Sequence, residues 1–233
     1  MRENTAPGLR MKTRRAVTEA LADTALDLFD SRGFDQVTVA DVVAAAGISQ
    51  RSFFRYFSNK EDVVFGDHIP SAEEVRDELL RHIDDVPAWD ALRATFRTAA
   101  LQMDADEGHW KRATRVICHT PGLRARYLEK HLAWTDALTP EIASRIGGGG
   151  PGGSGGPDTS SGPEGSNGSD TSGNPGNPGS SGSSDAELRA HTMINTALGC
   201  FDVALVRWAD DDTGLSLAAL VDDVFGFVRF PRP

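Results

Sequence analysis

Four polar side chains that follow Ser49 have the types and spacing needed to read base edges in DNA. They are Gln50, Arg51, Ser52 and Arg55, and Ser49 precedes them. A guanidinium can donate two hydrogen bonds to guanine, and a glutamine amide can pair with adenine. Arg51 and Arg55 are four residues apart, so a helix would place them on one face. We therefore expect a short helix, capped by Ser49, that presents this set to a DNA groove.

A second group of residues has side chains suited to phosphate oxygens. Thr38 and Ser58 are N-cap types, and helix N-termini offer free backbone N–H groups to anions. Tyr56 would place a phenol at the exit of the short helix. Lys60 would lie in the first turn after Ser58, where a cation is unfavourable for the helix dipole and a phosphate would explain it. With Ser49, these residues complete the predicted DNA-binding set.

Two further helices must position this set, and the sequence marks both. Residues 13–32 carry apolar side chains at three- and four-residue spacing, and Gly33 can end that helix. Thr38 to Asp41 form a capping box that opens a second helix, and Gly47 ends it. A third helix from Ser49 to about Tyr56 completes a helix-turn-helix, and the Ser58 cap would open a fourth.

The stretches from Gly33 to Ser49 and from Phe53 to Glu61 resemble the DNA-binding domain of the TetR family, over about residues 13–62. The resemblance implies phosphate contacts from Thr38, Tyr56 and Lys60 and base contacts from the set described first. It also implies that Phe53 and Phe57 are core residues. The sequence departs from the family at Phe54, where a tyrosine is common, so one phosphate contact would be lost or replaced by apolar packing.

Charge is distributed unevenly along the chain. The net charge is -10, yet basic and acidic residues balance within residues 1–66, so the excess of acids lies in residues 67–233. A locally basic face can still bind DNA in a chain of this kind. A basic group lies at the start of the first predicted helix and suits either a minor-groove arm or a frayed terminus. Its members are Arg10, Lys12, Arg14 and Arg15.

The rest of the chain predicts an all-α protein. Helical patterns cover residues 71–84, 88–103, 106–119, 122–146, 185–208 and 215–228. Residues 147–184 contain only Gly, Pro, Ser, Asn, Thr and three acids, which predicts a disordered linker. We expect a three-helix DNA-binding domain over 1–66 and a helical ligand-binding and dimerisation domain over 67–146 plus 185–233.

The stretch from Thr120 to Arg126, with Trp134 downstream, resembles the C-terminal domain of mycofactocin-system-type TetR regulators. That subgroup is associated with acyl-CoA-like ligands, which would need cations for the CoA phosphates. The available arginines are Arg112, Arg115, Arg124 and Arg126. Candidate pocket residues, for each of which ordinary core packing is the alternative, are Trp89, Leu92, Phe96, Trp110, Ile117, Cys118, Met193 and Asn195.

The TetR family dimerises through its final two helices, which here are the patterns within residues 185–228. Apolar positions that fit such a seam are Ala197, Phe201, Ala204, Leu205 and Trp208. The expected partners are thus a second copy of the chain and near-palindromic double-stranded DNA, with reading helices about 34–36 Å apart. The expected function is a transcriptional regulator, a repressor, switched by a small hydrophobic effector. The alternative is a ligand-independent DNA-binding regulator.

Signatures of other functions are missing from the sequence. The glycine-rich stretch has no Lys-Ser or Lys-Thr to complete a phosphate-binding loop. Cys118 and His119 would point about 100° apart on a helix, so they form no nucleophile–base pair. The histidines show no four-residue spacing for a metal. We therefore predict no enzyme, cofactor or metal site. Because the sequence shows neither a signal peptide nor an apolar span, we expect a cytoplasmic protein. Translation would start at Met1 or at Met11.

Overall fold

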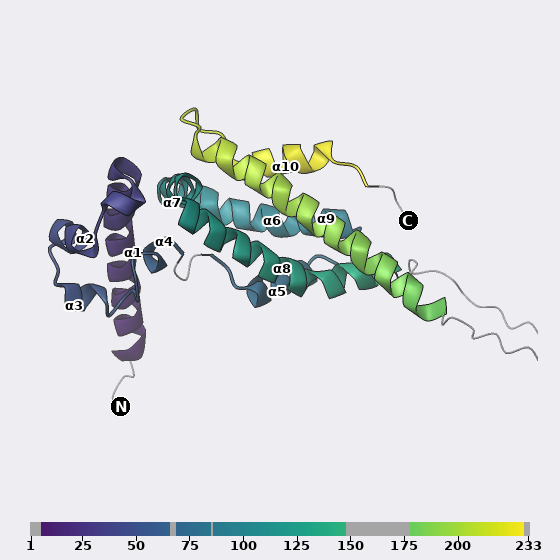
Figure 1. The fold of residues 1–233 in the computed structure, drawn as a ribbon, viewed down its shortest axis with the longest axis horizontal. Helices are drawn as coiled ribbons and strands as arrows, with labels where there is room; N and C mark the ends of the chain where they lie inside the picture. The colour runs from purple at the N-terminus through teal and green to yellow at the C-terminus, as the bar shows by residue number, and fades with distance from the viewer. Residues whose placement is uncertain (1–5, 66–68, 85, 148–177, 231–233) are drawn as a thin grey trace, which may run out of the picture.

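The computed structural model describes residues 6–65, 69–84, 86–147 and 178–230, and regular secondary structure there is helical (Figure 1). An N-terminal head contains α1 (Ala6–Arg32), a 3-10 turn (Phe34–Gln36), α2 (Val39–Ala46), α3 (Gln50–Phe53) and α4 (Asp62–Phe65). A helical body contains α5 (Ala72–Leu80), α6 (Ala88–Ala105), α7 (Glu107–His119), α8 (Pro121–Gly147), α9 (Pro178–Ala209) and α10 (Leu217–Phe227). The predicted all-α class and the helix-turn-helix in front of a helical domain are confirmed.

Local signals in the head act as expected. The Thr38 hydroxyl accepts from the Asp41 N–H, and the Asp41 carboxylate accepts from the Thr38 N–H, which closes the capping box at the start of α2. Gly47 ends α2 with φ of 65°, a left-handed conformation that favours glycine. Phe53 and Phe57 are buried and their rings lie 5.5 Å apart. These features fix the turn between α2 and α3.

Several predicted boundaries are wrong. The helix after Ser49 ends at Phe53 rather than near Tyr56. The fourth helix begins at Asp62 rather than directly after Ser58, and in the turn before it the Asp62 N–H donates to Asn59 Oδ1 at 2.8 Å. Lys60 therefore lies before that helix.

The first and the ninth helix also begin earlier than predicted. The first helix extends back to Ala6, so the backbone of Arg10 and Lys12 is helical. The ninth begins at Pro178 rather than at residue 185. Most of the linker predicted over 147–184 lies outside the described residues.

The body packs α8 against α9 and places α10 over α6 and α9 (Figure 1). Asp104, near the end of α6, accepts hydrogen bonds from the Ser216 hydroxyl and from the N–H groups of Leu217 and Ala218, and so holds the start of α10. Arg93 and Arg97 of α6 both pair with Asp222 of α10 at 2.9 Å. The last helix is therefore part of the same core.

The predicted dimer seam was assigned to the wrong face of α9. Its five apolar residues are all buried within one protomer: Ala197, Phe201, Ala204, Leu205 and Trp208. That face of α9 packs on the other body helices, which an amphipathic pattern alone cannot distinguish from a partner surface. The exposed face carries Gly199, Val203 and Val206 instead, with the two valines 63% and 42% exposed.

In the described ranges, no helix combines the length and apolar character of a membrane span.

Candidate nucleic-acid interface and its link to the body

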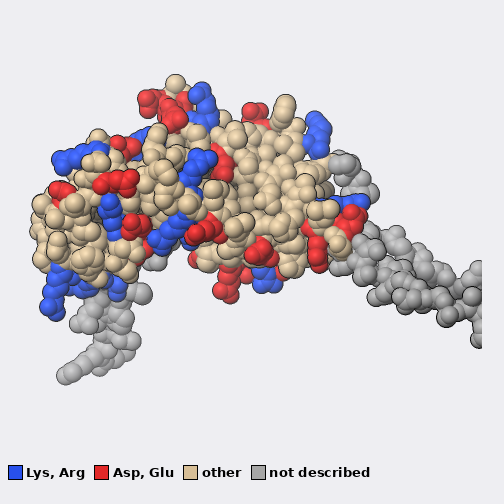
Figure 2. All heavy atoms as spheres, in the orientation of Figure 1, with Lys and Arg blue, Asp and Glu red and all other residues tan. Residues whose placement is uncertain are grey.

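The predicted reading residues lie together on one exposed part of the head. Gln50, Arg51 and Arg55 are exposed, and Ser52 is half-buried because its N–H and hydroxyl both contact Ser49 Oγ, at 3.1 and 3.0 Å. Figure 2 shows basic side chains grouped at the lower edge of the head, where α3 lies in Figure 1, and mixed charges over the body. The arrangement therefore presents two guanidinium groups and one amide to solvent, as base readout requires.

Two of the predicted phosphate contacts have partners within the head. The Arg55 guanidinium donates to the Tyr56 hydroxyl at 2.8 Å and lies 4.9 Å from the centre of its ring. The Thr38 hydroxyl is held by Asp41, and the hydrogen bonds from Thr38 lower the pKa of the Asp41 carboxyl. A negative charge thus sits beside Thr38. The Arg55 contact leaves the Tyr56 hydroxyl proton free to donate to a phosphate.

Lys60 is not placed for a phosphate contact. Its ammonium donates to the backbone carbonyls of Phe34 and Val37, at 2.7 and 3.0 Å, and lies 4.0 Å from the centre of the Phe34 ring. The Phe34 carbonyl also accepts from the Val37 N–H at 3.3 Å at the end of the 3-10 turn, so the ammonium adds a second donor there and supplies one to Val37. The structure therefore gives Lys60 a role in closing the turn between α1 and α2.

Replacing Lys60 with methionine is expected to lower the free energy of unfolding by about 1–3 kcal/mol, because two buried carbonyls lose a charged donor. The salt dependence of DNA binding should stay unchanged. Urea denaturation followed by circular dichroism measures the first quantity, and binding at several salt concentrations measures the second. If the variant kept its stability and the slope of log affinity against log salt concentration fell by about one, Lys60 would be a phosphate contact after all.

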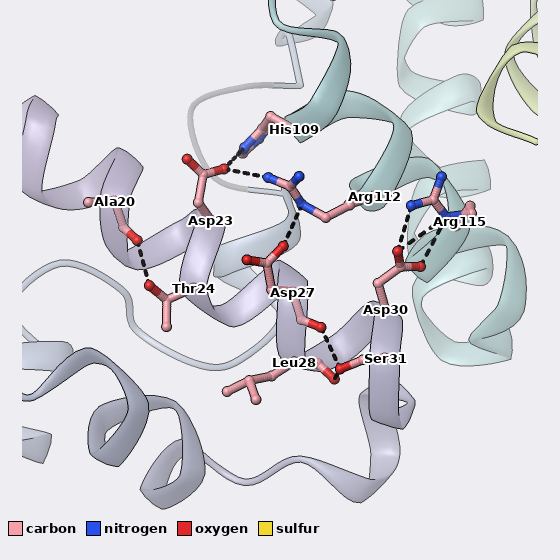
Figure 3. A network of polar contacts seen from close by, with 10 residues as sticks. All are labelled: Ala20, Asp23, Thr24, Asp27, Leu28, Asp30, Ser31, His109, Arg112 and Arg115. Carbon is pink, nitrogen blue, oxygen red and sulfur yellow. Dashed lines mark hydrogen bonds and ion pairs between the residues drawn. The ribbon is translucent and has the colours of Figure 1, made fainter. Parts of the chain in front are cut away.

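An ion-pair ladder joins the head to the body (Figure 3). Its acids project from α1 and its bases from α7, at three- and four-residue spacing, so each row lies on one helix face. We call this set the α1–α7 ladder: Asp23, Asp27 and Asp30 with His109, Arg112 and Arg115. His109 Nδ1 lies 2.9 Å from Asp23 Oδ1, Arg112 lies 3.1 Å from Asp23 and 3.0 Å from Asp27, and Arg115 lies 2.5 Å from Asp30.

Arg115 makes the most contacts in the ladder. Its guanidinium bonds both oxygens of Asp30 and also donates to the carbonyl oxygen of Ala209 at 3.0 Å, at the end of α9. The hydrogen bond to Asp30 raises the pKa of Arg115. Beside it, a hollow of about 240 Å³ between head and body is lined in part by Phe29, Phe34 and His119. Arg115 therefore connects α1, α7 and α9 at one point.

The predicted phosphate site for CoA is not assembled as a cluster of four arginines. Arg112 and Arg115 belong to the ladder, and Arg126 lies 3.4 Å from Asp62 of α4 and over the Phe65 ring. Arg124 is exposed on α8. Carboxylates of the head therefore balance three of these four charges. The sequence alone shows that an arginine is charged, but not whether a carboxylate of the same chain or a bound phosphate will pair with it.

The predicted pocket residues do not line one cavity. Phe96, Leu92 and Ile117 are buried in the core. Trp89 stacks on Phe225 and donates to its carbonyl oxygen. The remaining four are dispersed: Trp110 lies beside His109 near the head, Cys118 and Met193 are half-buried, and Asn195 is exposed and donates to the carbonyl oxygen of His191. Helical spacing selects residues on the core side of a helix, and most of these are core.

Sequence reasoning missed a partly buried polar cluster between α8 and α9. The Tyr127 hydroxyl donates to Asp202 Oδ1 at 3.0 Å, and His131 Nε2 lies 3.7 Å from the same oxygen. Burial raises the pKa of Tyr127 well above its ordinary value, raises that of Asp202 and lowers that of His131. The available signals were the four-residue spacing of Tyr127 and His131 and an acid within the apolar run of α9.

Replacing Asp202 with asparagine is expected to stabilise the protein at pH 7. The raised pKa means that the native carboxyl binds a proton more tightly than the unfolded one, so the charged form destabilises the native state above that pKa. Asparagine retains an acceptor for Tyr127. Its advantage should shrink as the pH falls through the raised pKa towards the ordinary 3.8. Urea midpoints at neutral and acidic pH test this, and an advantage that is constant with pH would contradict it.

Comparison with known proteins supports the division into head and body. The sequence profile of bacterial regulatory proteins of the tetR family matches residues 21–65, and that of the MftR C-terminal domain matches residues 86–150. A Mycobacterium tuberculosis protein assigned as the mycofactocin biosynthesis transcriptional regulator MftR is 32% identical over 141 residues, which are 60% of this chain and 71% of that protein.

Solved structures share the fold. The transcriptional regulator FadR from Bacillus subtilis, in complex with stearoyl-CoA, is 16% identical with a TM-score of 0.52, over 89% of this chain and 95% of FadR. The fatty acid degradation regulator FadR from Bacillus halodurans is 16% identical with a TM-score of 0.54, over 91% and 93%. The two matched profiles and the Mycobacterium tuberculosis relative show the family. The chain belongs to the TetR family of DNA-binding transcriptional regulators, carries an MftR-type C-terminal domain and is not an enzyme.

Proposed function

We propose that the protein is a homodimeric repressor in the cytoplasm that binds a near-palindromic operator and changes its affinity when a small hydrophobic effector of the acyl-CoA class binds the body. The observation that carries this proposal is the α1–α7 ladder, which fixes the exposed reading surface of the head to the helical domain. A rearrangement of the body that moves α7 would then move α1 and the reading helix with it.

The proposed DNA contacts follow from exposure. Gln50, Arg51 and Arg55 read bases, while Tyr56 and the capped N-termini at Thr38 and Ser49 meet phosphates. Ser52, whose N–H donates to Ser49 Oγ, is the fourth proposed base contact. Family membership supports the placement of this helix in a major groove.

The proposed dimer forms through residues 185–228, by the outer faces of α9 and α10. Val203 and Val206 of α9 are exposed next to Gly199, and Phe227 of α10 is 91% exposed. Apolar side chains of this size on the surface of one protomer favour burial against a second copy. Two heads in one dimer would read half-sites about one helical turn of DNA apart.

The acyl-CoA class of effector is supported by the MftR-type domain and by the shared fold with FadR of Bacillus subtilis, whose structure contains stearoyl-CoA. An effector that favours one arrangement of head and body needs a coupling of only about 1–3 kcal/mol to act as a switch. Thermal unfolding with dodecanoyl-CoA and with free CoA separates this reading from a ligand-independent regulator. A rise in melting temperature of about 5–10 °C with dodecanoyl-CoA alone supports the effector; no rise with either supports the alternative.

The DNA-binding half of the proposal is tested by selecting fragments from random DNA and measuring stoichiometry on the enriched sequence. We expect a near-palindromic motif that binds two protomers. Enrichment of no motif, or saturation with one protomer, would contradict the proposed dimeric operator complex.

A further inference from the structure

Two buried polar atoms of α8 have no hydrogen-bond partner among the described residues. They are His131 Nε2 and Thr135 Oγ1, and the two residues are 8% and 2% exposed. Four residues separate them, so they lie one turn apart on one face of the helix. A buried group without a partner destabilises a fold appreciably. Two on one face indicate a place where something else supplies the partners.

The helix itself could have satisfied Thr135. Buried Thr95 of α6 donates to the carbonyl oxygen of Ala91, one turn back in its own helix, at 2.9 Å. Thr139, on α8 like Thr135, bonds back in the same way, to Thr135 O at 2.7 Å. The Thr135 hydroxyl does not use this local route. Its orientation therefore serves a different partner.

The surroundings of His131 combine aromatic walls with converging polar atoms. The Tyr127 and Trp134 rings lie 4.4 and 5.3 Å from its ring. The Asp202 carboxylate of α9 stands 3.7 Å from its Nε2, beyond hydrogen-bond length but within reach of a bridging group. Small-molecule sites typically have this composition, apolar walls with a few polar groups that fix orientation.

The cluster suits an uncharged group. Burial raises the pKa of Asp202 and lowers that of His131, which means that charge is costly at this place. The other ionisable groups that act on this cluster are Cys118 of α7, whose pKa burial raises, and exposed Arg124 of α8. A bound carboxylate or phosphate would add a buried charge here, whereas a carbonyl can accept from Thr135 Oγ1 or His131 Nε2 and a hydroxyl can also donate to Asp202.

We propose that His131 and Thr135, with Tyr127 and Asp202, form the polar end of the effector site between α8 and α9, and that they hold an uncharged carbonyl such as that of an acyl thioester. This inference rests on the proposed acyl-CoA effector and assigns the side chains that recognise it. The thioester oxygen accepts from Thr135 Oγ1 or His131 Nε2, the two atoms that lack a partner.

The test is calorimetric binding of dodecanoyl-CoA to the full-length protein and to matched valine variants. Thr135→Val should lower the affinity about five- to tenfold and leave the melting temperature of the free protein unchanged or higher. Thr95→Val, which removes a partnered buried hydroxyl from α6, should lower the melting temperature and leave the affinity unchanged. His131→Phe, which keeps the ring, should lower the affinity as Thr135→Val does.

The outcomes separate this site from the proposed function. If wild-type protein binds dodecanoyl-CoA and both α8 variants bind it equally well, the site assignment is overturned and the acyl-CoA effector stands. If Thr135→Val lowers the melting temperature without changing the affinity, a buried water satisfies the hydroxyl and the assignment is again overturned. If wild-type protein does not bind dodecanoyl-CoA, the acyl-CoA effector and the site both fail.

Discussion

Replacing Arg51 with alanine is expected to weaken binding to the operator about five- to a hundredfold while binding to random DNA stays nearly unchanged. Arg51 is exposed at the start of α3, where a guanidinium can donate two hydrogen bonds to guanine. Loss of one such base contact costs about 1–3 kcal/mol, and it falls on the specific complex alone. Fluorescence anisotropy with the selected operator and a scrambled duplex measures both affinities.

Arg81→Ala is the matched control for this experiment, because Arg81 is exposed directly after α5 in the body and pairs locally with Glu78. It should leave both affinities unchanged. An equal loss on operator and scrambled DNA for Arg51→Ala would show that Arg51 contacts a phosphate and that base readout lies elsewhere on α3.

Replacing Arg115 with alanine is expected to lower the free energy of unfolding by about 1–3 kcal/mol and to reduce the effect of an effector on operator affinity. The change leaves Asp30 without its guanidinium and removes the donor to the Ala209 carbonyl oxygen. Since both partners are less than a third exposed, this pair should matter more than an exposed one. Urea denaturation and operator binding with and without dodecanoyl-CoA measure the two effects.

Arg76→Ala provides the comparison, because Arg76 also pairs with a single carboxylate, Glu141, but lies within the body and is 45% exposed. Its loss should cost no more than about 1 kcal/mol and leave the response to dodecanoyl-CoA intact. If Arg115→Ala and Arg76→Ala behaved alike in both measurements, the ladder would be an ordinary surface feature and coupling would run through other contacts.

The sequence predicted the head well because its determinants are local. The capping box at Thr38, the left-handed Gly47 and the Ser49 cap each depend on residues within four positions, and all three form as expected. The exposure of Arg51 and Arg55 follows from the same short elements. Such signals need no knowledge of the tertiary structure.

The failures are residues whose role depends on distant partners. Lys60 bonds carbonyls more than twenty positions away, and Arg112 pairs with acids on α1. A basic side chain in a sequence shows its charge but not whether a carboxylate, a carbonyl or a phosphate will balance it. The phase error on α9 has a related cause, since an apolar stripe shows that a face is buried but not whether the same chain or a second copy covers it.

The central claim is that the helical body controls the DNA affinity of the head, and one titration tests it most directly. Operator affinity of the wild-type dimer is measured by anisotropy with and without saturating dodecanoyl-CoA, with free CoA as the control. A change of about five- to a hundredfold that dodecanoyl-CoA alone produces is the predicted result. Bound dodecanoyl-CoA with an unchanged operator affinity would contradict the coupling that we infer from the α1–α7 ladder.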